Sequence, residues 1–147
     1  MKDIRGSTFI EIILIISIIS ILILIPLIRG GVFKSYKERE ELKEFIKDLN
    51  YARIRAIVES TRYSVNLKYG DNSYTIIKHT NPKEIIKRKE FTNGIRIRNS
   101  SIINNEIEFT PAGTPRDSKT IYLEDRNRNL IKITIRVATG KISVYFD

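Results

Sequence analysis

The sequence of 147 residues contains no cysteine and a single histidine, His79. Without cysteine the chain has no disulfide bond, no zinc–thiolate site and no thiol nucleophile. One histidine excludes a histidine-rich metal site, and we expect no Ser-His-Asp triad around it. We expect His79 to be an exposed polar residue at the end of a strand. With no phosphate-binding loop and no dinucleotide fingerprint, the sequence predicts a protein that is not an enzyme and holds no metal or cofactor.

Charge is absent from one long segment near the N-terminus. Residues 12–28 are apolar except for Ser17, Ser20 and Pro26. Counted from Ser7, the segment forms a helix of about 33 Å, which matches a hydrocarbon core of about 30 Å. We therefore expect residues 7–32 to be a transmembrane helix, in which Pro26 is tolerated as a kink. No later segment is as apolar, so a single-pass protein of the cell membrane is predicted.

The residues before this segment form a short leader, residues 1–6. Lys2 and Arg5 outnumber Asp3, which favours a cytoplasmic N-terminus and an extracytoplasmic head. An ordinary secretory signal is the main alternative. It would need a small-x-small cleavage site after the apolar run, and the residues around Gly30 fit that pattern poorly.

One carboxylate, Glu11, lies directly before the apolar run. An acidic residue at the centre of a membrane helix costs about 2.5–3.5 kcal/mol on insertion scales, so such a charge is retained where something pairs with it. Ser7 lies four residues before Glu11 and shares its helical face. An amino group freed at Ser7 would therefore meet Glu11 of its own chain or of a chain packed alongside.

The motif Gly6-Ser7-Thr8-Phe9-Ile10-Glu11 before an apolar run resembles the processing site of type IV pilins and pseudopilins. The resemblance implies that a prepilin peptidase cuts between Gly6 and Ser7 and methylates the new Ser7 amino group. It also implies that Glu11 pairs with the N-terminal ammonium of a neighbouring subunit. Ser7 replaces the phenylalanine usual at the first mature position, which favours a minor subunit.

A second helix is predicted after Gly30-Gly31, where a break from the membrane segment is expected. Apolar residues recur there at three- and four-residue steps, with charged residues on the other face. The apolar stripe consists of Leu42, Phe45, Ile46, Leu49, Ala52, Ala56 and Ile57. We expect this amphipathic helix to end near Ser60-Thr61.

From Tyr63 onward the alternation of apolar and polar residues predicts strands. We expect a hairpin of residues 63–69 and 73–79, then strands over 84–91, 94–98, 106–110, 120–124, 130–137 and 141–146. Residues 125–129 read as a turn and not as a metal loop, because arginines separate the oxygen-bearing side chains. The apolar stripe needs a cover. The predicted fold is α+β, with a long N-terminal helical spine, transmembrane then amphipathic, packed on an antiparallel β-sheet head of residues 33–147.

Two later stretches narrow the resemblance. Residues 45–57 followed by Val65-Asn66-Leu67 look like the helix-to-first-strand region of the GspH/FimT group of minor pseudopilins. Residues 107–113, 120–123 and 133–140 are similar to the C-terminal pattern of that group, which includes type II secretion pseudopilins, minor type IV pilins and competence pseudopilins. The resemblance implies a structural filament subunit. Its partners would be the prepilin peptidase, other pilin or pseudopilin subunits, the inner-membrane assembly platform and membrane lipid.

The formal net charge of +9 suggests a second function. Basic residues gather in the middle of the chain, namely Lys87, Arg88, Lys89, Arg96 and Arg98. Such a cluster can hold DNA phosphates, which would fit a DNA-binding subunit of a competence pseudopilus. The plainer interpretation is a solvated strand face. A third hypothesis is a membrane-anchored domain that never assembles.

Overall fold

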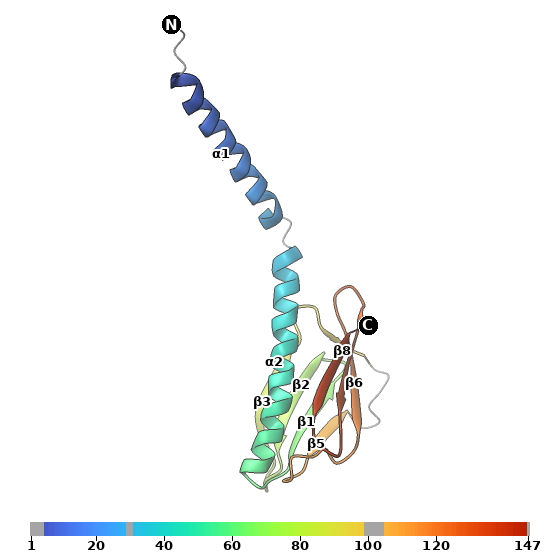
Figure 1. Ribbon diagram of the computed structural model, residues 1–147. Coiled ribbons are helices and arrows are strands. Elements are labelled where there is room, and N and C mark those ends of the chain that lie inside the picture. The colour runs from blue at the N-terminus through green and yellow to red at the C-terminus, as the bar shows by residue number, and fades with distance from the viewer. Residues whose placement is uncertain (1–4, 29–30, 99–104, 147) are drawn as a thin grey trace. The chain divides into compact units, whose positions relative to one another are not determined.

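The computed structural model describes residues 5–28, 31–98 and 105–146 (Figure 1). The chain divides into two compact units, Met1–Tyr36 and Lys37–Asp147. The first unit is helical. The second unit contains all eight strands that the described residues form, together with most of the second helix.

Helix α1 spans Arg5–Ile28 and includes Pro26. The hydroxyls of Ser17 and Ser20 donate to the carbonyl oxygens of Ile13 and Ile16, at 2.7 and 2.8 Å. In the part of the chain that the structure describes, no helix is long and apolar enough to cross a membrane. The membrane segment expected over residues 7–32 therefore stays a prediction.

Helix α2 spans Gly31–Val58. Its first residue lies in the expected Gly30-Gly31 break, of which Gly30 is outside the described residues. The helix ends slightly before the predicted Ser60-Thr61. At this end the Glu59 amide donates to the Arg55 carbonyl, and Ser60 adopts a positive φ of 48° that stops the helix.

The predicted apolar stripe of α2 is the buried face of the helix, with two exceptions. Buried are Leu42, Phe45, Leu49, Ala52 and Ala56. The prediction was wrong for Ile57, which is 46% exposed, and too strong for Ile46, which is only partly buried. These two isoleucines lie at the margin of the stripe, where the sheet covers the helix incompletely.

The strands form two four-stranded antiparallel sheets where the sequence analysis expected one. The first sheet has the order β3-β2-β1-β5, with β1 at Tyr63–Lys68, β2 at Ser73–Lys78, β3 at Glu84–Glu90 and β5 at Glu106–Phe109. The second has the order β4-β6-β7-β8, with β4 at Arg96–Ile97, β6 at Lys119–Glu124, β7 at Leu130–Ile135 and β8 at Ile142–Phe146. The predicted hairpin is confirmed, because β1 and β2 pair from Tyr63↔Lys78 to Lys68↔Ser73.

Strands β4 and β7 differ most from their predicted bounds. Strand β7 stops at Ile135, since the Arg136 carbonyl accepts the Gly140 amide in a tight turn. Strand β4 has only two residues. The turn expected over residues 125–129 is present, and the Asp125 carboxylate accepts the Asn129 amide at 2.7 Å.

One hydrophobic core joins α2 to both sheets. Figure 1 shows α2 lying along β2 and β3. The rings of Phe45, Tyr74 and Phe91 meet there, with centroid separations of 4.8–5.4 Å. The second sheet adds alternate residues of β6 and β7, which are buried as alternation predicts: Ile121, Leu123, Ile131, Ile133 and Ile135.

Arg53 of α2 joins two loops that are far apart in sequence. Its Nε donates to the Gly113 carbonyl at 3.0 Å and its Nη2 donates to the Thr139 carbonyl at 2.9 Å. Gly113 and Gly140 have φ values of +73° and +61°, which favour glycine. A Cβ on Gly140 would lie 2.3 Å from the Gly113 carbonyl oxygen. The glycines of the C-terminal sequence pattern therefore let both loops close on α2.

Replacing Gly140 by alanine should destabilise the head. The positive φ alone costs roughly 1–2 kcal/mol for a residue with a Cβ, and the contact with the Gly113 carbonyl adds to that. Gly70→Ala is the matched control, because its Cβ would meet nothing within 4 Å. Urea unfolding of both variants measures the difference, and equal unfolding midpoints would show that the two loops are not closely packed.

The core makes a second prediction, measured on a fragment of residues 33–147, which we expect to fold as a soluble monomer. Leu49 is fully buried, so Leu49→Ala should cost about 2–5 kcal/mol. Ile46 is only partly buried, so Ile46→Ala should cost distinctly less. Chemical denaturation of the two variants tests this order, and a reversed order would mean that α2 is rotated on the sheet.

Candidate functional site

The described surface of α1 is mostly apolar. All described side chains from Thr8 to Ile23 are exposed, and Phe9 and Ile10 each keep 67% of their surface accessible. The hydroxyls of Ser17 and Ser20 are satisfied by the backbone of their own helix. In other proteins, a helix that is apolar around most of its surface is generally buried in a large core or a membrane.

Glu11 is the one acidic residue of α1 and lies within its regular part. Its side chain is exposed and has no ion-pair partner among the residues that the structure describes. Ser7 lies in the same helix one turn earlier, although its side chain is outside the description. The helical geometry that the Ser7–Glu11 argument needs is present, while cleavage and methylation stay predictions.

The basic residues predicted as a DNA surface do not share one face. Lys87 and Lys89 of β3 point to α2, as residues two apart on a strand should. The Lys87 ammonium lies 3.1 Å from a Glu44 oxygen and 2.7 Å from an Asp48 oxygen, and Lys89 also pairs with Glu44. Arg88, between them, lies 3.4 Å from Asp71. Two of the five cations are therefore neutralised by the helix.

The sequence analysis did not predict that α2 carboxylates pair with these lysines, because it expected the charged residues of the helix on its solvent face. Glu41 and Asp48 are buried beside the apolar stripe. With Glu44 between them, these residues are spaced along one side of the helix. This spacing is the sequence feature that could have predicted their shared environment. Hydrogen bonds from Lys89 and Lys87 lower the pKa of Glu44.

Each buried carboxylate of α2 has a defined partner. Asp48 accepts the Tyr74 hydroxyl at 2.5 Å. Burial and this hydrogen bond raise the pKa of Tyr74, so the phenol stays protonated. Glu41 accepts the backbone amides of Thr92 and Asn93 at 2.6 and 3.1 Å. These contacts hold the segment after β3 against the helix.

The remaining two predicted cations lie in a groove at the second sheet. Arg96 and Arg98 line a hollow of about 700 Å³ together with Tyr69 and Glu124. Arg98 pairs with Glu124 at 3.3 Å. An adjoining hollow of about 520 Å³ adds Arg126 and Arg128, which the sequence analysis placed in a turn and did not consider as a basic surface.

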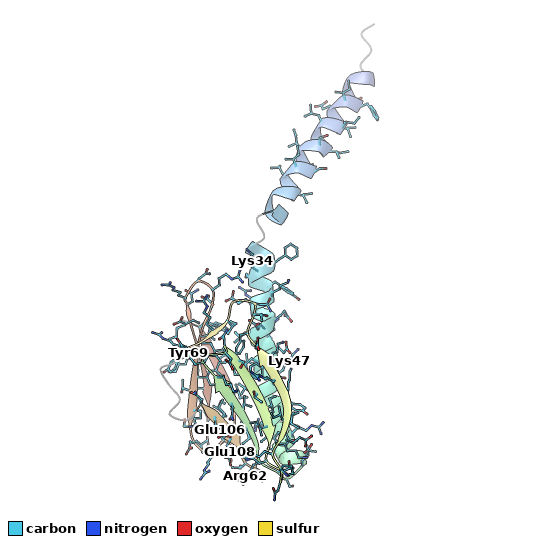
Figure 2. The ribbon with its side chains drawn as sticks, turned by 180° about the vertical axis from the view of Figure 1, so that it is seen from behind. Lys34, Lys47, Arg62, Tyr69, Glu106 and Glu108 are labelled. Atoms are coloured by element: carbon cyan, nitrogen blue, oxygen red, sulfur yellow. The ribbon has the colours of Figure 1, made fainter. Side chains whose placement is uncertain are left out.

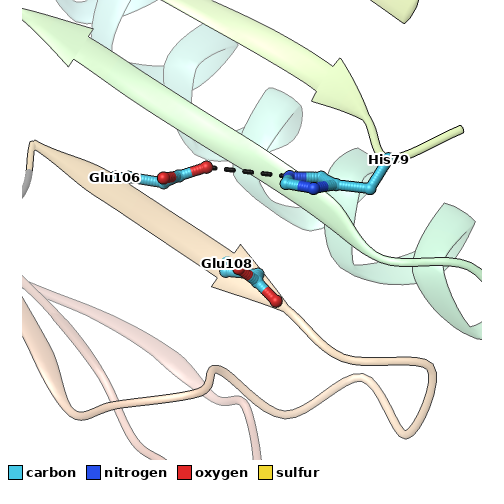
Figure 3. Close-up of side chains that lie close together, drawn as sticks. All are labelled: His79, Glu106 and Glu108. Atoms are coloured by element: carbon cyan, nitrogen blue, oxygen red, sulfur yellow. Dashed lines mark ion pairs between the residues drawn. The ribbon is translucent and has the colours of Figure 1, made fainter. Parts of the chain in front are cut away.

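His79 is not the exposed residue that the sequence analysis predicted. Its side chain is 12% exposed, and its Nε2 lies 2.9 Å from the Ser64 hydroxyl and 3.7 Å from a Glu106 oxygen. Figure 3 shows His79 facing Glu106 and Glu108 of β5. Figure 2 places Glu106, Glu108 and Arg62 at one end of the head and Tyr69 toward the other. Strand register brings together groups that lie far apart in sequence.

Comparison with known proteins finds likeness in structure and none in sequence. No protein-family model and no curated protein matches the chain. The structure is similar to that of the minor pseudopilin EpsH from the type 2 secretion system of Vibrio cholerae. The TM-score is 0.59 at 11% identity, over 74% of this chain and 96% of EpsH.

A second similar structure is the type IV minor pilin FimU of Pseudomonas aeruginosa. Its TM-score is 0.62 at 16% identity, over 78% of this chain and 92% of FimU. Identity this low establishes the fold alone. The predicted fold class is confirmed, and the chain has the α+β pilin-like fold shared by a minor pseudopilin and a minor pilin.

Proposed function

We propose that the chain is a minor pilin or minor pseudopilin, a structural subunit that a prepilin peptidase cleaves and that then enters a filament of the type II secretion or type IV pilus kind. The observation that carries the proposal is α1, an apolar helix with a single carboxylate one turn after Ser7. The pilin-like fold of the head supports it.

The surface of α1 gives the physical reason for assembly. Removing apolar surface from water contributes about 25 cal/mol per Å², and every described side chain of α1 from Thr8 to Ile23 is exposed. Before assembly, lipid of the cell membrane would cover the helix. In the filament, the corresponding helices of other subunits would cover it instead, and a contact between unlike faces that does not close extends such a filament.

Glu11 makes this assembly directional. In an apolar surround an unpaired carboxylate is costly. Cleavage after Gly6 would create an ammonium at Ser7, one turn from Glu11 of the same chain and available to Glu11 of a neighbour. A helix packed beside α1 in one particular stagger pairs both charges. Peptidase, assembly platform and neighbouring subunits are the partners that this role requires.

The DNA-binding alternative is less well supported by the geometry. Lys87 and Lys89 are paired with α2 carboxylates, which removes them from a phosphate-binding surface. Arg96 and Arg98 lie on another part of the head. A competence role for DNA uptake would therefore depend on the groove arginines and not on the β3 lysines. The structural role needs no such surface.

Processing between Gly6 and Ser7 is the first consequence to test. Intact mass of the chain extracted from membranes of cells that contain the peptidase should correspond to a chain that starts at methylated Ser7. Gly6→Ala should be tolerated better than Gly6→Leu, because the peptidase must approach the backbone closely. A chain that keeps Met1, or one that starts after Ile28, would contradict the proposal.

Assembly is the second consequence. Glu11→Gln should be cleaved as efficiently as the unchanged chain and should be largely missing from sheared filaments, because the charge serves pairing and not the cut. Glu11→Lys should assemble even less, since it brings like charges together. Glu40→Gln, an exposed change on α2, is the control. Filament levels unchanged by Glu11→Gln would exclude the pairing argument.

A further inference from the structure

Two glutamates and one histidine converge on the face of the first sheet that is turned away from α2. Glu106 and Glu108 lie two residues apart on the edge strand β5, so both project from the same face. Register places Glu106 opposite Asn66 and Glu108 opposite Ser64 on β1. His79 follows directly after β2, on the far side of β1.

The potential ligand atoms of these three residues are close together. One oxygen of each carboxylate and one ring nitrogen of His79 all lie within 4.8 Å of one another. The His79 Nε2 and the Glu106 Oε1 are 3.7 Å apart (Figure 3). All three side chains are half-buried. Ligand atoms around a tetrahedral zinc ion lie about 2.0–2.2 Å from the metal, so small rotations of these side chains would bring all three to coordinating distance.

We propose that His79, Glu106 and Glu108 bind one divalent transition-metal ion of the zinc class. Imidazole together with carboxylates suits zinc, whereas calcium takes six to eight oxygen ligands. A site with three protein ligands leaves a fourth position for water. The ion would connect the end of β2 to the edge strand β5 across β1, which is the only strand that the described β5 pairs with in its sheet.

A neighbouring side chain supports the site independently. The Oδ1 of Asn66 is buried and has no hydrogen-bond partner among the described residues. Asn66 stands opposite Glu106 in register, so side chains of the two residues are neighbours on the same face. A buried carbonyl oxygen without a donor is uncommon. A metal-bound water beside Glu106 would supply the missing donor.

A metal ion would have to replace contacts that the three side chains already make. The Ser64 hydroxyl is buried and lies 2.9 Å from the His79 Nε2, so this hydrogen bond would yield to the metal. Glu108 lies 3.3 Å from Arg62 and 4.0 Å from Arg116. Both arginines are more than half exposed, and exposed ion pairs are weak. Removing Arg116 should therefore strengthen metal binding.

Zinc titration of the full chain in detergent, without a histidine tag, tests the proposal. With one histidine and no cysteine in the sequence, imidazole-dependent binding can come only from His79. Calorimetry should give one zinc ion per chain, and the single set of His79 ring signals in NMR spectra should shift. Loss of an outer-shell partner typically costs about 10–100-fold in metal affinity, so His79→Gln and Glu106→Gln, which remove direct ligands, should each weaken binding by at least that factor. Arg116→Gln should strengthen it.

Glu90→Gln, a change at an exposed carboxylate on β3, is the matched control and should bind as the unchanged chain does. Circular dichroism of each variant verifies folding. If His79→Gln does not fold, Glu106→Gln and the ring signals of the unchanged chain decide. The proposal would be overturned if zinc did not shift the His79 ring signals. It would also be overturned if Glu106→Gln bound zinc as tightly as the unchanged chain.

Discussion

The fold of the head depends on α2, whose apolar stripe must be buried and whose carboxylates beside that stripe must have partners. Its apolar stripe, centred on Phe45 and Leu49, is buried on the sheets. Beside that stripe lie the buried Glu41 and Asp48 and the partly exposed Glu44. A buried charge left unpaired is costly. The sheet supplies Lys87, Lys89 and Tyr74, and the loop after β3 supplies two backbone amides. The partners fix both the position of the helix along β3 and its rotation on the sheet.

Arg53 makes a second set of contacts between α2 and the rest of the head. Its guanidinium binds carbonyls of two loops, one before β6 and one between β7 and β8. Because Gly113 and Gly140 lack side chains, the loops approach each other and the helix closely. The second sheet is thereby held to the same helix as the first. All residues of this core lie in the second unit, Lys37–Asp147.

Much of the fold could be predicted from periodicity. The spacing of Leu42, Phe45 and Leu49 predicted the buried face of α2, and the alternation in residues 63–78 predicted a hairpin with the observed turn. Periodicity does not report how strands are ordered, so the division into two sheets was missed. It also treats all charged residues as solvent-facing, which hid Glu41 and Asp48. The environments of His79 and Lys87 depend on the register of β5 and on the rotation of α2, and neither follows from local sequence. The predicted cleavage motif at Gly6-Ser7, in contrast, is read from local sequence, and cleavage there stays a prediction.

The proposed function requires that α1 leaves the membrane and packs against other subunits. A photo-crosslinking residue at Ile16, which lies on the exposed surface of α1, tests it most directly in cells that produce the whole filament system. We expect Ile16 to crosslink to the N-terminal helix of another subunit and this product to be lost in the absence of the peptidase. A processed chain whose Ile16 crosslinks to lipid alone would contradict it.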